Sequence, residues 1–318
     1  IPYLPQPVDR QTFRDTYQLP RQAVLLGPWA TKDWPAMKEW VHPTTGLPNW
    51  SHLAQSYGHS TVSVMVCNGY MSTLMDPDQQ DMSFANFCHM WKDDHEPERL
   101  YCKDWHFQME FRHHDKVYSV PNVLQDDWLN AWWDHRDLKN ELQDDFRFAY
   151  MGYSGSWTPL HADVFRSHSW SANICGIKRW TLFPPGQEGP LLDPSHPHLR
   201  PNGNPNDIQD YDSLPPHAIL YQYPGEVVFV PSGWYHQVEN LGPTISLNHN
   251  WSNASNLDIM TRTLGQDLHE VTSAIKEYRQ ALGPEFPHHC QTLLRANSGW
   301  NCLEYWRYLS WAASRVRT

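Results

Sequence analysis

The sequence predicts a mainly β protein, a sandwich or jelly roll with helical flanks. Short segments between residues 147 and 251 are rich in β-branched and aromatic residues, and Gly, Pro and Asn separate them. After residue 251 the period switches to that of a helix. Many short strands with tight turns are typical of stacked sheets. The expected strands are 147–153, 167–175, 178–183, 225–230, 235–239 and 244–251.

The first 146 residues predict short helices mixed with isolated strands. Valine alternates with other residues over 61–66, which is the period of a half-buried strand. Residues 82–91 place Phe84, Phe87 and Trp91 on one helical face, after Ser83 as a candidate cap. Residues 126–133 predict a short aromatic-rich helix.

The end of the chain predicts helices. Apolar residues recur at alternate steps of three and four over 257–282, which indicates a helix of about seven turns. Asn256 is a candidate cap, and Gly283 followed by proline ends the helix. Packing against the domain is the favoured role of this apolar stripe, a dimer interface is the alternative, and the oligomeric state is left open. A second helical stretch follows with apolar residues three apart: Leu303, Trp306 and Leu309.

These patterns divide the chain into three parts. We expect N-terminal helices and strands over 1–146, a β core over 147–252, and a helical extension packing on the core over 253–318. The core is interrupted by residues 186–224, which contain eight prolines. We interpret this stretch as an irregular surface insertion, either functional or simply solvated.

Composition excludes several classes of protein. The 318 residues are 40% hydrophobic and 19% charged, which is typical of a globular chain. The net charge of −11 and the lack of a Lys and Arg run disfavour nucleic-acid binding and suit a basic partner. No apolar run approaches the ~20 residues of a membrane helix. The six cysteines form no C-x-x-C pair, which favours reduced thiols. We expect a cytoplasmic protein, with the nucleus as an additional compartment.

One triplet, His161-Ala-Asp163, suggests a metal site. Residues two apart share a face of a strand, so an imidazole and a carboxylate can chelate one ion. His236, which follows a predicted strand and a Pro-Ser-Gly turn, is the candidate third ligand. Two histidines and one carboxylate leave coordination positions open, which favours iron(II) used for oxygen chemistry over a closed zinc site. Alone, the triplet would indicate no more than polar surface, but Lys178 follows on a predicted strand 17 residues after His161.

Four longer stretches carry a family resemblance. They are His161-Ala-Asp163, Gly176-Ile-Lys-Arg-Trp-Thr-Leu-Phe-Pro-Pro185, Pro224-Gly-Glu-Val-Val-Phe-Val-Pro-Ser-Gly-Trp-Tyr-His236 and Thr244-Ile-Ser-Leu-Asn-His-Asn-Trp251. Together they resemble the JmjC oxygenase family in its small hydroxylase branch, over roughly residues 27–310. The resemblance implies a double-stranded β-helix of eight strands, a cupin-like fold, with iron(II) and 2-oxoglutarate at its open end.

The resemblance also assigns roles to residues. His161, Asp163 and His236 resemble the iron ligands, and Lys178 resembles the cation that binds the distal carboxylate of 2-oxoglutarate. A cation is what a partly buried dicarboxylate needs at its far end. The remaining matches resemble groups beside the cosubstrate, with a structural role as the alternative for one asparagine: Tyr101 and Thr158 as hydroxyls, Asn248 and Asn250 on the last strand, and Ser171 where several relatives have asparagine.

The implied reaction uses O2 and 2-oxoglutarate to hydroxylate a C–H bond, with succinate and carbon dioxide as co-products. Residues 100–105, 163–170 and the C-terminal helices are closest to enzymes that hydroxylate a lysyl side chain in a eukaryotic translation termination factor, which would be the protein partner. Two alternatives stand beside this. Demethylation of N-methyl-lysine in histones is disfavoured because the chain has no cysteine-rich zinc module. A non-catalytic cupin-like binding protein is disfavoured by the complete set of ligands and lysine.

Overall fold

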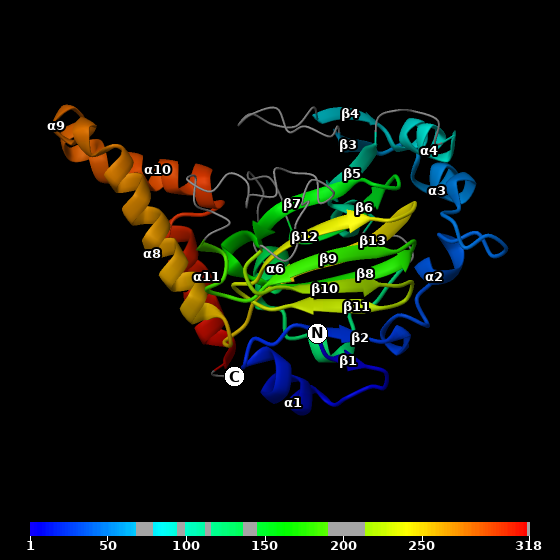
Figure 1. Cartoon of the computed structure of the whole chain (residues 1–318). Helices are drawn as coiled ribbons and strands as arrows, with labels where there is room; N and C mark the ends of the chain where they lie inside the picture. Colours follow the sequence, from blue (N-terminus) through cyan, green and yellow to red (C-terminus); the bar gives the residue numbers. More distant parts are fainter. Residues whose placement is uncertain (68–78, 94–98, 112–115, 136–144, 190–213, 317–318) are drawn as a thin grey trace.

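Two sheets stack at the centre of the fold in the computed structural model, which describes residues 1–67, 79–93, 99–111, 116–135, 145–189 and 214–316 (Figure 1). The larger sheet has the order β1 (Tyr3–Leu4), β2 (Val24–Leu26), β11 (Val227–Val230), β8 (His168–Cys175), β13 (Thr244–Trp251), β6 (Arg147–Gly152), β5 (Leu100–Trp105), β3 (Thr61–Val66) and β4 (Gln79–Ser83). The smaller sheet has the order β10 (Ala218–Gln222), β9 (Lys178–Phe183), β12 (Tyr235–Asn240) and β7 (Trp157–Ala162).

The strands from β6 to β13 form the predicted jelly roll. Four of them lie in each sheet, and neighbours within this set pair antiparallel. The N-terminal strands extend the larger sheet at both edges of the jelly roll. Strands β1 and β2 lie beyond β11, and β5, β3 and β4 lie beyond β6. The fold class predicted from the sequence is therefore confirmed, whereas the division at residues 147 and 253 stays a prediction.

Side-chain alternation explains two of the apolar clusters of the fold. In β11, Val227 and Phe229 join the large cluster beneath the N-terminal segment, while Val228 and Val230 join the smaller cluster between the sheets. Both faces of this strand are covered, so its sequence is apolar throughout. In β8 and β13 only the outer face packs in the large cluster, and the alternate residues are polar. Those polar residues face the space between the sheets, where the site lies.

The N-terminal helices cover the outer face of the larger sheet. They are α1 (Arg10–Phe13), α2 (Ala36–Glu39), α3 (Trp50–Tyr57), α4 (Phe84–Asp93) and α5 (Phe107–Glu110). Helix α6 (Trp128–His135) instead packs in the apolar cluster of the C-terminal helices. The predicted helix over 82–91 is confirmed as α4, with its three aromatic residues buried. Ser83 Oγ accepts from the backbone N–H of Asn86 at 3.3 Å, as a cap does. The predicted strand 61–66 and the helix near 126–133 are found as β3 and α6.

The C-terminal helices α8 (Leu257–Ala274), α9 (Arg279–Leu282), α10 (Phe286–Ser298) and α11 (Cys302–Val316) lie on the side opposite α2 to α4 (Figure 1). The prediction of one helix over 257–282 was wrong, because α8 ends at Ala274 and a 3-10 turn precedes α9. Asn256 does not cap α8 with its side chain. Its Oδ1 accepts from Asn253 N at 3.0 Å, and its Nδ2 donates to Ser232 Oγ at 2.8 Å.

The apolar stripes pack only in part. Met260 and Leu264 of α8 are buried, but Tyr278 beyond its end is 55% exposed. In α11, Leu303 and Trp306 are 54% and 63% exposed, whereas Leu309 packs against the helical cluster, so the predicted face was wrong at two of its three residues. The α11 residues that pack instead are two aromatic residues and one small residue, which are three or four positions apart and so lie on the same face of the helix. They are Tyr305, Tyr308 and Ala312.

The interpretation of residues 186–224 as irregular was wrong at one end. Strand β10 pairs with β9 along its whole length, from Ala218 opposite Leu182 to Gln222 opposite Lys178. It lies at the edge of the smaller sheet, and its apolar residues Ile219 and Tyr221 are exposed. Residues 190–213 lie outside the described part of the chain. All six cysteines are free thiols. Among the described helices none is both long and apolar enough to cross a bilayer.

Candidate metal and cosubstrate site

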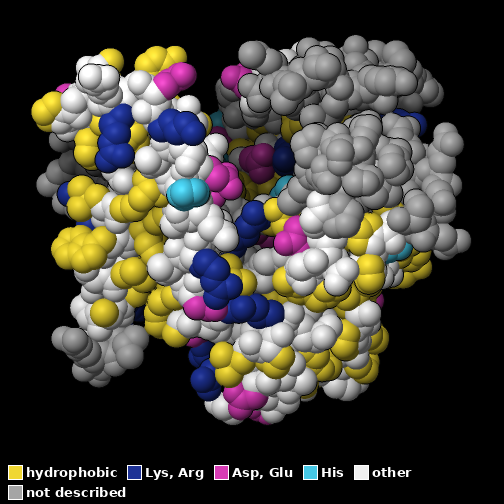
Figure 2. Space-filling view, turned by 60° about the vertical axis from the view of Figure 1, so that its left-hand side comes forward, with side chains coloured by type: hydrophobic (Ala, Val, Ile, Leu, Met, Phe, Trp, Pro, Cys, Tyr) yellow, Lys and Arg dark blue, Asp and Glu magenta, His cyan; other side chains and the backbone are white. Residues whose placement is uncertain are grey.

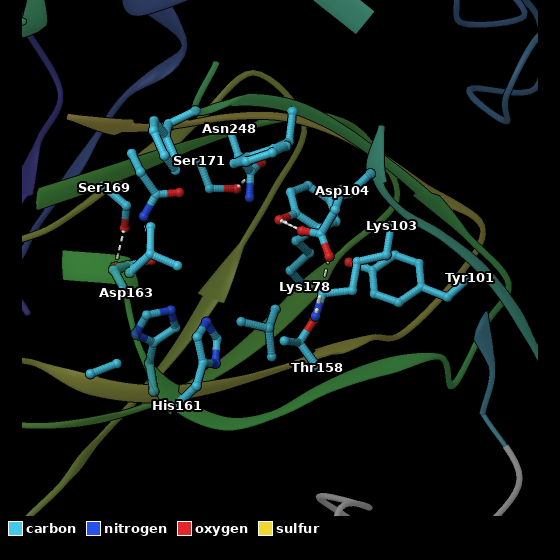
Figure 3. Close-up of a pocket in the computed structure, with 18 of the residues that line it drawn as sticks. Tyr101, Lys103, Asp104, Thr158, His161, Asp163, Ser169, Ser171, Lys178 and Asn248 are labelled. Carbon is cyan, nitrogen blue, oxygen red and sulfur yellow. Dashed lines mark hydrogen bonds and ion pairs between the residues drawn. The ribbon is translucent and has the colours of Figure 1, made fainter. Parts of the chain in front are cut away.

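A cavity of about 360 Å³ lies between the two sheets (Figure 3). Strands β5 to β9, β12 and β13 contribute its walls. His161 and Asp163 lie at one end of the cavity, while Tyr101, Thr158 and Lys178 lie together at the other. All nine site residues predicted from the sequence line this one cavity: Tyr101, Thr158, His161, Asp163, Ser171, Lys178, His236, Asn248 and Asn250.

Three predicted ligands converge at the first end. The register of β12 against β7 places His236 opposite His161, with ring centroids 4.3 Å apart. Asp163 comes one residue after the end of β7, so the two members of the triplet do not share one strand as expected. One ligand atom from each residue nevertheless lies within 4.8 Å of the other two. This spacing can hold a single metal ion.

Hydrogen bonds orient these ligands. The Nδ1–H of His161 donates to the Pro159 carbonyl at 2.8 Å, which leaves Nε2 with its lone pair for a metal. Asp163 accepts from Ser169 Oγ at 2.7 Å and from Asn250 Nδ2 at 2.8 Å. Among the described residues, His236 Nδ1 is buried without a hydrogen-bond partner. A buried nitrogen left unpaired beside two further donors fits a metal position.

Burial sets the charge of the two imidazoles. Desolvation, aided by the neighbouring His236, lowers the pKa of His161 to about 4, although Asp163 opposes the change. Desolvation also lowers the pKa of His236, again against Asp163. Both rings are therefore neutral near pH 7, which is the form that binds metal. Two neutral imidazoles and one carboxylate form the donor set of a mononuclear iron(II) site with open positions.

Lys178 provides the positive charge at the other end. Its side chain is 2% exposed, and Nζ donates to Ser246 Oγ at 2.7 Å and lies 5.9 Å from the centre of the Tyr150 ring. Within the described part of the chain, no carboxylate lies within ion-pair distance of this ammonium. Burial accordingly lowers the pKa of Lys178 to about 7. A buried cation without a counter-charge, facing a cavity, fits an anionic ligand.

A strand irregularity brings Thr158 to the same cavity as His161. His236 of β12 pairs with His161 of β7, and Val238 pairs with Thr158. A step of two residues on β12 therefore corresponds to a step of three residues on β7. The extra residue is a β-bulge, and it turns two side chains three apart toward one side. Tyr101 is buried and lies at the same end of the cavity as Thr158 and Lys178, so two hydroxyls lie near the lysine. Burial raises the pKa of Tyr101, which keeps its proton available for donation.

Comparison with known proteins agrees with this geometry. The cupin-like domain family matches residues 10–257. The chain is 38% identical to the 2-oxoglutarate and iron-dependent oxygenase JMJD4 of Danio rerio, over 99% of this chain and 75% of that protein. Against the Homo sapiens protein of the same name the identity is 39%, over 94% and 72% of the two chains. The chain belongs to the cupin-like JmjC oxygenase family. It is also 37% identical to the arginine-specific demethylase JMJ20 of Arabidopsis thaliana, over 94% of this chain and 66% of that protein.

The other predicted positions lie along two neighbouring strands of this JmjC fold. Asn248 and Asn250 lie two apart on β13, and both side chains line the cavity. Ser171 of β8 donates to Asn248 Oδ1 at 3.0 Å. Asn250 instead holds the metal ligand Asp163. The structure thus gives Asn250 a positioning contact, whereas the predicted contacts of Asn248 and Ser171 with a cosubstrate stay predictions.

Some residues of this JmjC site were missed in the sequence. Ser169 holds Asp163, and Ser246 accepts from Lys178. Each serine lies two positions before a predicted site residue on the same strand, and residues two apart share a face of a strand. The alternation of polar residues in β8 and β13 could therefore have predicted that both serines face the cavity. Lys103 and Asp104, which also line the cavity, gave no such signal because they lie at an irregularity of β5.

Proposed function

We propose that this protein is an iron(II)- and 2-oxoglutarate-dependent protein hydroxylase. The observation that carries the proposal is the pairing, in one cavity, of three converging metal donors with a buried lysine at the opposite end. His161, Asp163 and His236 would hold iron(II) and leave positions open for the keto acid and O2. Lys178 would bind the far carboxylate of 2-oxoglutarate. The names of the JMJD4 relatives give the same two cofactors.

The residues of the chain have separate tasks in this mechanism. When bound, iron and 2-oxoglutarate supply the oxidising power that lets O2 hydroxylate a C–H bond, with succinate and carbon dioxide released. Ser169 and Asn250 fix the carboxylate of Asp163, so the metal meets a ligand of set orientation. The hydroxyl of Ser246 holds the ammonium of Lys178 in place for an incoming carboxylate. The chain therefore contributes ligand geometry and a buried cation in the same cavity.

We propose further that the oxidised group is a lysyl side-chain carbon in a protein. One wall of the cavity consists of Phe146 and the alternate β6 residues Phe148 and Tyr150. Their ring centroids lie 6.5 and 6.2 Å apart in succession. A row of aromatic rings suits the methylene stem of a long basic side chain, and ring faces attract its cationic end.

A bulge in β5 adds a carboxylate beside this wall. The register against β6 gains one residue between Cys102 and Trp105, and Asp104 has a φ of 57°. Because of the bulge, the consecutive residues Lys103 and Asp104 both line the cavity, where a regular strand would turn one of them away. The Tyr150 hydroxyl donates to Asp104 at 2.5 Å. Asp104 also pairs with Lys103 at 3.7 Å, so the charge that suits a basic substrate is the net charge of −11 of the whole chain.

The partner that we propose is a eukaryotic translation termination factor, which the sequence resemblance implies. Demethylation is the second candidate, because one relative of similar identity is named an arginine-specific demethylase. Both reactions begin with hydroxylation of a C–H bond. Oxidation of an N-methyl carbon gives a carbinolamine that releases formaldehyde and leaves N–H, whereas oxidation of a side-chain carbon away from nitrogen leaves a lasting alcohol.

The product of the reaction separates these candidates. Matched peptides carrying lysine, N-methyl-lysine or N-methyl-arginine, from the termination factor and from histone tails, are incubated with the enzyme, iron(II) and 2-oxoglutarate. We expect a mass increase of one oxygen on unmodified lysine, seen by mass spectrometry. Methyl loss without oxygen on plain lysine would favour the demethylase. Inactivity toward every peptide, without 2-oxoglutarate turnover, would favour a binding protein.

Cosubstrate binding should depend on pH through Lys178. In the free protein the pKa of this lysine is about 7, and a bound carboxylate favours the protonated form. The affinity for 2-oxoglutarate should therefore be greatest below pH 7 and weaken as the pH rises, by up to about tenfold per unit until the pKa of the complex is reached. Calorimetric titration from pH 6.5 to 9 measures this. Lys178→Arg, which stays charged, should bind with a much flatter profile, and equal slopes would contradict the assignment.

A further inference from the structure

The turn that follows Asp163 has an unusual backbone. Phe165 and Arg166 both adopt left-handed conformations, with φ of 57° and 52°. Neither residue is glycine, asparagine or aspartate, and each left-handed residue of this kind costs roughly 1–2 kcal/mol. Such a turn persists only where the surrounding structure holds it. The metal ligand Asp163 immediately precedes it.

The C-terminal helices hold this turn through a ring stack. The Phe165 ring stacks on Trp300, with centroids 3.9 Å apart and planes 30° apart. Trp300 belongs to the link between α10 and α11 and is 3% exposed. The preceding residue, Gly299, has a φ of 80°, and a Cβ there would lie 3.0 Å from the Phe165 ring. The link thus supplies both a ring for Phe165 to stack on and the space that it needs.

The other half of the turn is joined to the second histidine ligand. Arg166 Nη2 donates to the Tyr235 hydroxyl at 2.8 Å, and its guanidinium carbon lies 4.9 Å from the centre of that ring. Tyr235 immediately precedes His236 in β12. The turn is therefore fixed on both sides, by the C-terminal helices at Phe165 and by the neighbour of a metal ligand at Arg166.

The turn also has room to relax if the stack is lost. A second cavity of about 440 Å³ is lined by the turn, by α8 and by the α10–α11 link, and it shares Asp163 and Phe146 with the first cavity. Figure 2 shows a hollow in the surface that contains acidic, basic and histidine side chains, whereas the described lining of the second cavity includes no histidine. Without Trp300, the Phe165 ring could move into this space and the backbone could return to an unstrained conformation.

We propose that the C-terminal helices are a positioning element for the metal: Trp300 and Gly299 hold the Phe165–Arg166 turn in its strained conformation, and the turn orients the carboxylate of Asp163. This inference rests on the proposed function only through the metal, and it holds for any substrate. Trp300 is a positioning residue that acts through Phe165. Its effect should appear in metal affinity before any turnover takes place.

The test measures binding of Mn(II), a redox-inert substitute for iron(II), by the electron paramagnetic resonance signal of the free ion. Loss of an outer-shell contact usually weakens metal binding about 10- to 100-fold, and we expect at least the lower value for Trp300→Leu. Trp300→Phe keeps a stacking ring and should restore most of the affinity. Trp306→Leu, an exposed site on α11, is the control and should bind like the wild type. Wild-type affinity in Trp300→Leu would overturn the proposal.

A second pair of variants separates positioning from general stability. Phe165→Ala and Phe165→Gly both remove the ring, but only glycine adopts a positive φ without strain. Glycine should therefore keep the turn better and bind Mn(II) more tightly than alanine, and the two variants are compared well below the temperature at which either unfolds. Equal or reversed affinities would overturn the proposal. Failure of the wild type to bind Mn(II), or unchanged binding in Asp163→Ala, would instead reject the metal assignment.

Discussion

His161→Ala and Asp163→Ala are each expected to reduce 2-oxoglutarate turnover and peptide hydroxylation to background. Each variant removes one of three donors that lie within 4.8 Å of one another, and two remaining ligands do not hold iron(II) at working concentrations. Both side chains are only half-buried, so the fold should survive. Succinate formation and Mn(II) binding should both be lost, while the thermal unfolding of the metal-free protein changes little.

Two controls test whether the loss of turnover is specific to the metal ligands. Asp267→Ala removes a carboxylate from the neighbouring cavity, where it accepts from Ser298, and should leave turnover near normal. In the wild type, zinc, cobalt or nickel should occupy the site and inhibit, because the donor set binds these ions without supporting the oxygen chemistry. Near-normal turnover in either ligand variant with a lysyl peptide would show that the ligands were assigned wrongly.

The core of the fold could be predicted because alternation and turn residues are local signals. Five strands of the larger sheet (β3, β6, β8, β11 and β13) were found this way, since their outer faces pack in one large apolar cluster, whereas β1, β2, β4 and β5 were not predicted. Strand β7 was not predicted as a strand, because Pro159 and a bulge break its pattern. Strand β10 was missed since an edge strand buries few residues. The break after Ala274 was missed because the apolar period continues past it.

The sequence predicted those site residues that lie close to one another along the chain. His161 and Asp163 are two residues apart, and Lys178 follows on the strand after next, so sequence order carried their relation. Bulges and ring-stacking contacts cannot be recognised from the order of residues in the sequence. The Lys103–Asp104 bulge depends on pairing with a strand more than forty residues later, and Trp300 reaches the metal site only through tertiary packing. These contacts follow from the folded structure and not from local pattern.

Lys178→Met is expected to weaken 2-oxoglutarate binding strongly and to stabilise the folded protein. Losing a charge-assisted hydrogen bond in a buried site costs about 2–3 kcal/mol, which corresponds to a rise of roughly 30- to 150-fold in the apparent Kd. The free energy of unfolding, in contrast, should increase in this variant. Burial lowers the pKa of Lys178 to about 7, below its unfolded value, so the unfolded chain binds the extra proton between those two values. The wild type should therefore gain stability as the pH rises above 7, a gain that the methionine variant lacks.

The matched control for this variant is Lys103→Met, which removes the second lysine of the cavity. Lys103 lies 3.7 Å from Asp104 as an ion pair at the bulge, so it already has a counter-charge and is not needed for the distal carboxylate. Its loss should change the Kd for 2-oxoglutarate much less than the loss of Lys178. Mn(II) binding should stay normal in both variants, since neither lysine is a metal ligand. If Lys178→Met kept the wild-type Kd while Lys103→Met raised it, the cosubstrate carboxylate would have to be assigned to the β5 bulge instead.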